Sequence, residues 1–444
     1  MLAPRTLNNL LDLAAIPAAA IPASARAAAR LSLYDWFAVA LAGENEPVAQ
    51  IVRGLVADEG GQEAASVVGL DRKVPARAAA LANGAASHAL DYDDTHFAHV
   101  GHPSVAILPA ALAVAEATDA PASAVLDALL LGAEASIRIG MVLGRPHYDR
   151  GFHQTATAGA FGATVAAARV MELTRDETRH ALSLVATRAS GLKSQFGSMG
   201  KPFNAGIAAS NGVEAAELAK RGFVSADDGV GGPQGFIDAH ADQTFEETAW
   251  ASPSPETFLF EDVKHKLHAC CHGLHETIEA LSAARLSNRL DPVDVTAVDI
   301  RVNPRWLRVC DIKRPRTGLE AKFSYAMVTA MTLHHVDTAS DAVYTNALCG
   351  DPSLASFCHK VAVTGDEAIR DTAAAVRIER HCAPTIEASF DLAERLPADV
   401  LERRLRDKAA ALIGSDAADV LWREVAGLES VSASHLARNL RMRS

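Results

Sequence analysis

The chain has 444 residues, of which 49% are hydrophobic and 22% are charged, as in an ordinary soluble globular protein of two or three domains. Its 54 acidic residues outnumber its 42 basic residues, which gives a formal net charge of −12. This balance argues against a nucleic-acid-binding or anionic-membrane surface, because both need a spread of positive charge. A small anionic substrate would need a local basic pocket.

The N-terminal segment has the small and apolar residues of a signal peptide, but Asp12, Pro17 and Pro22 interrupt its apolar stretch. No apolar run is long enough to cross a bilayer. The six cysteines all follow residue 269 and form no CxxC pair, which argues against a zinc knuckle or a disulfide framework. We therefore expect a cytoplasmic protein with reduced thiols and no membrane partner.

Apolar periodicity and the spacing of glycine and proline predict that the first 265 residues are almost wholly helical. The predicted helices include Ser24–Ala42, Pro75–Leu90, Ser104–Ala117, Pro121–Leu143, Thr155–Glu172 and Arg175–Gly191. Alanine and glycine dominate several of them, which lets helix axes approach closely and indicates interior helices. Thr174, followed by Asp176 and Glu177, is a predicted helix cap.

The pattern changes after about Leu290, where β-branched residues cluster or alternate as in strands. The predicted strands are "VTAVDIRVNP", "KVAVTGD", "AAAVRIERH" and "TIEASFDLA", with helical "KFSYAMVTAMTLHH" and "SDAVYTNALCG" between them. The last fifty residues return to amphipathic helix. We predict a mainly α protein with an all-helical domain (1–265), an inserted α+β domain (266–395) and C-terminal helices (396–444) that return to the helical domain.

The stretch "HALDYDDTHFAHVGHPS", residues 88–104, places three aspartates and four histidines between apolar helices. If residues 80–92 are helical, His88 and Asp91 share a face. Pro103 is well placed to open the next helix, so residues 93–102 form a loop, where catalytic groups concentrate.

Two other interpretations of this stretch remain open. In the first, Asp93, Asp94 and Thr95 form a cap or turn and the histidines are solvated. In the second, the HxxHxxH histidines and an aspartate bind a metal; these histidines are His96, His99 and His102. The HxxHxxH spacing matches no strong metal-binding signature, so we predict no metal.

Three further stretches carry candidate chemistry. In "HYDRGFHQTATAGAFG", His153 precedes Thr155, a plausible N-cap of a glycine-rich helix whose backbone donors attract anions. In "GLKSQFGSMGKPFNAG", Lys201 lies in a short predicted loop before another helix, where it could bind a carboxylate or act as a base if desolvated. Each could equally be an ordinary surface residue.

The third stretch, "KHKLHACCHGLHETIEAL", gathers lysines, histidines and two cysteines just before a helix. A reactive cysteine there would need a pKa lowered by nearby cations or by a helix N-terminus. A cysteine–histidine nucleophile pair at Cys270 or Cys271 is therefore an alternative interpretation.

Together these stretches resemble the MmgE/PrpD family, which includes 2-methylcitrate dehydratases, cis-aconitate decarboxylases and iminodisuccinate epimerase. The matching segments are "HALDYDDTH…HPSVAILPAALAVAE", "GFHQTATAGAFGA", "GSMGKPFNAGIAASNGVEAAELAKRGF" and "KLHACCHGLHETIEAL", in order from about residue 6 to about residue 435. The resemblance implies a helical domain, a smaller α+β domain, a homodimer, and an active site between the domains. The catalytic positions that it implies fall on Asp91, His102, His153, Lys201 and Lys266.

The chain departs from the decarboxylating members at two positions. Those members carry a histidine five residues after the last lysine, where this chain has Cys271 with His272 beside it. Those members also carry a tyrosine shortly after the "FS" motif. In this chain the tyrosine, Tyr325, follows that motif directly, and Met327 stands at the later position where the tyrosine of those members lies. These departures argue against decarboxylation, and the "HACCHGLHETIEAL" segment is most similar to that of iminodisuccinate epimerase.

The predicted function is therefore a cofactor-independent epimerase of iminodisuccinate, in which one group removes an α-proton and another returns it on the opposite face. Predicted catalytic residues are His102, His153, Lys266 and Asp91, with Asp91 orienting His102; predicted substrate-binding residues are Lys201, His96, Cys271, His272 and Tyr325. The alternatives are a 2-methylcitrate-type dehydratase, a non-catalytic polycarboxylate-binding protein and a metal-dependent hydrolase. For the epimerase and the first two alternatives, the partner is a small polycarboxylate.

Overall fold

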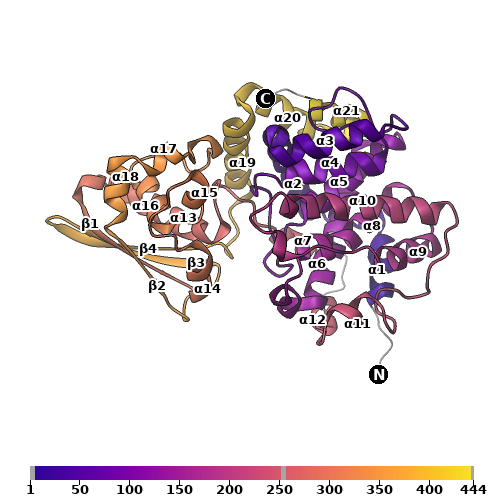
Figure 1. Cartoon of the computed structure of the whole chain (residues 1–444), viewed down its shortest axis with the longest axis horizontal. Coiled ribbons are helices and arrows are strands. Elements are labelled where there is room, and N and C mark those ends of the chain that lie inside the picture. The colour runs from indigo at the N-terminus through magenta and orange to yellow at the C-terminus, as the bar shows by residue number, and fades with distance from the viewer. Residues whose placement is uncertain (1–5, 252–256, 442–444) are drawn as a thin grey trace. The chain divides into compact units, whose positions relative to one another are not determined.

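The chain divides by its internal contacts into two compact units, which are described separately below (Figure 1). The structure is a computed structural model that describes residues 6–251 and 257–441, so residues 1–5 of the predicted N-terminal domain lie outside it. The first unit is Met1–His265 with Ile413–Ser444, and the second is Lys266–Leu412. Of the predicted C-terminal segment 396–444, residues 396–412 group with the second unit, where Arg404 pairs with Glu279 at 2.6 Å.

The first unit is helical throughout its regular structure. Its helices are α1 (Thr6–Ala14), α2 (Ala23–Ala42), α3 (Pro47–Glu59), α4 (Ala76–Ser87), α5 (Ser104–Ala117), α6 (Ala122–Arg150), α7 (Gln154–Thr157), α8 (Gly159–Val170), α9 (Arg175–Val185), α10 (Gly200–Lys220), α11 (Phe236–His240), α12 (Glu246–Trp250), α20 (Ser415–Ala426) and α21 (Ala433–Leu436). The predicted capping box is confirmed, because Thr174 and Glu177 bond each other's backbone at the start of α9.

Small residues bring the central helices into close contact, as the sequence predicts. A Cβ atom on Gly206 of α10 would lie 2.3 Å from the Leu81 carbonyl oxygen of α4, and one on Gly162 of α8 would lie 2.4 Å from the Gly132 carbonyl of α6. Glycine is therefore required at both helix crossings. Helix α5 is buried along almost its whole length. The core of this unit is formed by α4, α5, α6, α8 and α10.

Several helix boundaries differ from the sequence prediction. Helix α4 ends at Ser87 rather than at Leu90, and the predicted helix 155–172 is split into α7 and α8. Helix α9 ends at Val185, short of Gly191. Helix α6 continues beyond its predicted end at Leu143, but Gly144, with φ of 65°, kinks it directly after that residue.

The second unit combines helices with one small mixed sheet (Figure 1). Its elements are α13 (His275–Asn288), β1 (Val295–Val302), α14 (Pro304–Cys310), α15 (Gly318–Ala321), α16 (Tyr325–Leu333), α17 (Asn346–Cys349), α18 (Pro352–Cys358), β2 (Val361–Gly365), β3 (Ala373–Arg380), β4 (Ala383–Asp391) and α19 (Ala398–Ile413). All four predicted strands are confirmed. The stretch predicted as one helix at 340–350 forms a short 3-10 turn and α17 instead.

The strand order is β2-β1-β3-β4, with β1 and β2 parallel and the other pairs antiparallel. Ile300 lies at the centre, paired with Val363 on one side and Val376 on the other. Helix α13 packs against β3 and β4 and covers apolar residues of the sheet, as expected for an α+β unit. No helix in the described part of the chain combines the length and the apolar character that crossing a membrane takes.

Candidate active site

The candidate site of the first unit is built on the loop between α4 and α5, residues 88–103, which we call the 88–103 loop. Its backbone takes up left-handed conformations at Asp91 and Val100, with φ of 51° and 56°. Thr95 and Lys264 exchange two backbone hydrogen bonds of 2.8 and 2.7 Å, and the His96 amide donates to the Gly101 carbonyl. The loop is thus folded back on itself and hydrogen-bonded to the segment around Lys264, just before the boundary of the first unit at His265.

Asp93 lies between two imidazole rings of this loop. Its Oδ1 is 2.9 Å from His88 Nδ1, and its Oδ2 is 2.7 Å from His102 Nδ1. Burial by itself would raise the pKa of Asp93, but the charges and hydrogen bonds of His102 and His88 outweigh it and hold that pKa well below its usual range. The carboxylate is therefore ionised at neutral pH, although its side chain is only 1% exposed.

The other ring nitrogen of His102 faces a second carboxylate. His102 Nε2 lies 3.5 Å from Asp91 Oδ1, which in turn lies 2.6 Å from Lys201 Nζ. Burial lowers the pKa of His102 to about 4, against the opposing influence of Asp93. At neutral pH this imidazole is therefore uncharged and able to accept a proton. Lys201 lies in the first turn of α10, not in the loop that the sequence predicts.

His153 supplies a second neutral imidazole beside the first. It directly precedes α7, and its Nδ1 lies 3.2 Å from the Asn204 side-chain nitrogen of α10. Its ring is stacked on that of His88 at a centroid distance of 6.0 Å. Burial, followed by the positive charges of His88, Lys201 and His102, holds the pKa of His153 well below its usual value.

Thr155 does not cap a helix as predicted, because it lies inside α7, and its hydroxyl accepts a hydrogen bond of 3.1 Å from the His102 amide. A Cβ atom on Gly101 would lie 2.9 Å from the Thr155 amide nitrogen. Glycine at this position therefore lets the 88–103 loop approach α7 closely. The contact places His102 and His153 on adjoining segments.

The HxxHxxH histidines do not converge, so the metal interpretation of that motif is wrong. His96 Nε2 donates to the Leu259 carbonyl at 2.9 Å, and His99 Nε2 lies 2.8 Å from the Ser136 hydroxyl. Both rings are buried, which also contradicts the interpretation of solvated histidines. The sequence predicts that His96 binds substrate, but the hydrogen bond to the Leu259 carbonyl occupies Nε2 of His96.

A different set has spacing compatible with a metal: one ligand atom from each of four residues lies within 4.8 Å of the others, namely His88, Asp91, Asp93 and His102. The Lys201 ammonium, however, already neutralises Asp91, and two imidazoles occupy both oxygens of Asp93. Both carboxylates of the set thus already lie against positively charged or imidazole groups, an arrangement that suits proton transfer.

The first unit thus brings together four of the predicted site residues: Asp91, His102, His153 and Lys201. Sequence reasoning missed His88, Asp93 and Asn204 as members of the cluster. Asn204 stands three residues after Lys201, and this helical spacing could have pointed to it. One of the interpretations that the sequence left open places Asp93 in a cap or turn, and no local spacing relates it to either imidazole.

The remaining predicted residues belong to the second unit: Lys266, Cys271, His272 and Tyr325. His272 lies beside His275, with ring centroids 4.6 Å apart, and the Cys271 amide donates to the Lys322 carbonyl. Tyr325 begins α16, and its hydroxyl donates a 2.6 Å hydrogen bond to the Gly273 carbonyl. This bond favours a structural role for Tyr325 over the predicted contact with substrate.

The cysteine nucleophile loses support at Cys270, because burial raises the pKa of its thiol far above the usual value. Lys266 and Lys322 lower it too little to compensate. The six cysteines all lie in the described residues and form no disulfide with one another.

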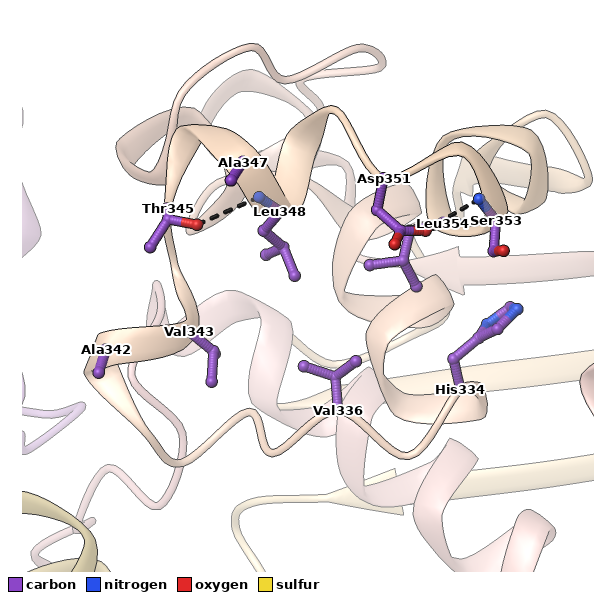
Figure 2. Close-up of a pocket in the computed structure, with 10 residues that line it drawn as sticks. All are labelled: His334, Val336, Ala342, Val343, Thr345, Ala347, Leu348, Asp351, Ser353 and Leu354. Carbon is purple, nitrogen blue, oxygen red and sulfur yellow. Dashed lines mark hydrogen bonds between the residues drawn. The ribbon is translucent and has the colours of Figure 1, made fainter.

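The second unit also contains a cavity of about 520 Å³ beside α16, α17 and α18 (Figure 2). Its walls are mainly apolar, with Val336, Val343 and Leu354 among them, and Asp351 and Thr345 use their side chains to cap neighbouring helices. None of the predicted site residues lines this cavity. Its lining therefore gives no support to the predicted chemistry.

Comparison with known proteins supports the sequence resemblance along both parts of the chain. The MmgE/PrpD N-terminal domain matches residues 13–248, and the MmgE/PrpD C-terminal domain matches residues 268–387. A cis-aconitate decarboxylase-like protein, oryM, of Aspergillus oryzae is 26% identical over 447 residues, which cover 92% of this chain and 91% of that protein.

Two proteins named cis-aconitate decarboxylase match shorter parts. That of Aspergillus terreus is 28% identical over 61% of this chain and 59% of its own length. That of Homo sapiens is 34% identical over 34% of this chain and 32% of its own length. Because the N-terminal family model alone spans more than half of the sequence, the chain belongs to the MmgE/PrpD family.

Proposed function

We propose that this protein is a cofactor-independent enzyme that transfers a proton at a carbon next to a carboxylate of a small polycarboxylate. The observation that carries the proposal is the arrangement around His102. One ring nitrogen, Nδ1, lies 2.7 Å from Oδ2 of buried Asp93, and the other lies on the side of Asp91 and the Lys201 ammonium. A neutral imidazole, anchored at one nitrogen and placed beside a cation, is suited to removing a proton from an anionic substrate.

Each residue has a distinct part in this proposal. Lys201 binds a substrate carboxylate, which displaces Asp91 from the ammonium. His102 accepts the proton through Nε2, and the substrate's negative charge raises the pKa of His102 above the value of about 4 that burial gives it. The resulting imidazolium is stabilised by Asp93. A second group carries the proton for the other face, and we propose His153 or, as the family resemblance implies, Lys266.

Within this chemistry we propose epimerisation of iminodisuccinate as the reaction. The C–H bond breaks, the proton passes to one protein group, and a second group returns a proton to the opposite face of the same carbon. This reaction needs neither loss of carbon dioxide nor departure of hydroxide. It is consistent with Cys271 at the position where the decarboxylating members resembled by this chain carry histidine.

A lyase reaction, in particular dehydration of a 2-methylcitrate-type substrate, is the second candidate. The names of the relatives favour the lyase class as a whole, since cis-aconitate decarboxylases are lyases. Removal of an α-proton begins this reaction too, and the difference lies in whether a neighbouring hydroxyl leaves afterwards.

The test is proton NMR of the purified protein in D₂O with iminodisuccinate, 2-methylcitrate and cis-aconitate in separate reactions. Epimerisation predicts that deuterium enters the α-position of iminodisuccinate with inversion and without an alkene product. An unlabelled iminodisuccinate together with an unsaturated acid formed from 2-methylcitrate would replace epimerisation by dehydration. Binding of all three compounds with no exchange and no product would leave a polycarboxylate-binding protein instead.

Lys266→Met tests the contribution of the second unit to this reaction. Methionine keeps most of the side-chain volume and removes the ammonium, so we expect loss of turnover with an unchanged circular dichroism spectrum. Full activity in the Lys266→Met variant would remove this lysine from the mechanism and leave His102 and His153 as the two proton-carrying groups.

A further inference from the structure

The position of Asp93 between His88 and His102 assigns a function to His88 and extends the one proposed above for Asp93. We propose that Asp93 is the positioning residue of His102, that it fixes the Nδ1–H tautomer of that ring, and that His88 holds Asp93 in place for this purpose. The inference deepens the proposed function and rests on it for its catalytic meaning.

The hydrogen-bonding capacity of the three side chains fixes their protonation pattern. An ionised carboxylate only accepts hydrogen bonds, so a neutral ring whose Nδ1 bonds to Asp93 must donate from that nitrogen. His88 Nδ1 and His102 Nδ1 are 2.9 and 2.7 Å from its two oxygens. Neutral His102 then carries its proton on Nδ1 and presents an unprotonated Nε2. For His102, this is the nitrogen on the side of Asp91 and Lys201.

Asp91, to which the sequence argument gave the orienting role, is placed differently. It lies 3.5 Å from His102 Nε2, and its side chain is 37% exposed against 1% for Asp93. It also pairs with Lys201 at 2.6 Å. Asp91 is thus on the side of the ring where substrate chemistry is proposed, and a carboxylate there cannot direct the proton to Nδ1. The orienting role therefore passes to Asp93.

His88 contributes by occupying the second oxygen of Asp93. A buried carboxylate with one partner would leave its other oxygen without a hydrogen bond, which is costly in the protein interior. His88 removes that cost and restricts rotation of the carboxylate. Its ring also packs edge-on against His102, with centroids 4.7 Å apart, and is stacked on His153. The His88 side chain has no exposed surface, which fits a supporting role.

The experiment combines nitrogen-15 NMR with the variants Asp93→Asn, Asp91→Asn and Asp94→Asn. The two rings contact different oxygens of Asp93, and asparagine replaces one of these oxygens with an NH₂ donor, so in this arrangement it cannot accept Nδ1–H from both rings. The wild-type protein at neutral pH is expected to show His102 as the Nδ1–H tautomer and a proton on Nδ1 of His88, with each signal assigned by its loss in His102→Gln and His88→Gln. In Asp93→Asn at least one of the two signatures should change to Nε2–H.

Turnover gives the second measurement. We expect kcat of Asp93→Asn to fall at least about a hundredfold with little change in KM, because a misplaced proton affects the chemical step rather than binding. Asp94→Asn is the matched control: it changes the adjacent buried carboxyl group, whose bonds go to Ser104, and should keep the His102 tautomer and kcat.

Each outcome decides the matter. An Nε2–H tautomer of His102 in the wild type, or a tautomer change in Asp91→Asn and none in Asp93→Asn, would overturn the assignment to Asp93. Wild-type kcat in Asp93→Asn, with the tautomer altered, would overturn the importance of the bond for turnover. The tautomer of His102 in the wild type can be read even if Asp93→Asn does not fold. This measurement also needs no substrate. Absence of proton exchange with every polycarboxylate would therefore count against the proposed function and not against the tautomer assignment.

Discussion

Replacing Asp94 with asparagine tests how burial changes the ionisation of a carboxyl group in the 88–103 loop. Asp94 is 2% exposed, and its two oxygens accept hydrogen bonds from the amide and the hydroxyl of Ser104 at the start of α5. Burial raises the pKa of Asp94 to about 7, and the negative charges of Asp93 and Asp35 add to the increase, while the Ser104 bonds oppose it. An asparagine side chain at this position would mimic the neutral acid in shape.

The pKa difference determines the size and sign of the effect on stability. Because the pKa of Asp94 rises from 3.8 in the unfolded chain to about 7 in the folded protein, the folded state binds a proton between these values that the unfolded state has lost. The stability contributed by this group is complete below the lower pKa and is lost as pH rises through the higher one. The shift corresponds to about 4 kcal/mol, of which about 3 kcal/mol is lost between pH 5 and pH 8.

The assay compares the free energy of unfolding of Asp94→Asn and wild type by urea denaturation at pH 5 and pH 8. Since asparagine does not titrate, the variant should gain about 3 kcal/mol relative to wild type between the two pH values. Asp58→Asn, which removes an exposed carboxylate of α3, controls for loss of a charge as such. An equal difference between Asp94→Asn and wild type at both pH values would refute the raised pKa.

Two further substitutions test the site and the helix packing. Lys201→Met removes the ammonium that pairs with Asp91, and we expect KM for the polycarboxylate substrate to rise at least about tenfold. The control, Lys193→Met, should leave KM unchanged. Equal effects of the two substitutions on KM would contradict carboxylate binding by Lys201. Gly206→Ala places a Cβ atom 2.3 Å from a carbonyl oxygen of α4, and we expect a loss of a few kcal/mol in urea unfolding. As a control, a Cβ atom added at Gly54 of α3 meets no atom within 4 Å, so Gly54→Ala should raise the free energy of unfolding by up to about 1 kcal/mol. Similar changes in the free energy of unfolding for both substitutions would show that α4 and α10 can move apart freely.

The sequence by itself determined the secondary structure wherever the pattern depends on near neighbours in the chain. The capping box at Thr174, the start of α5 after Pro103 and the four strands follow from side-chain chemistry and periodicity over a few residues. Glycine and alanine along α8 and α10 predicted close helix contacts, because a missing side chain allows approach whatever the partner. The sequence also directed attention to the 88–103 loop.

Only the tertiary structure decided which partner each polar side chain of that loop takes. His88 and Asp91 do not share a helix face, since α4 ends at Ser87 and the chain turns sharply at Asp91. Lys201 reaches Asp91 because α10 packs against α4, more than a hundred residues away in the chain. Hydrogen-bond partners within a folded loop depend on backbone reversals and on packing between distant helices, and neither leaves a periodic signal in the sequence.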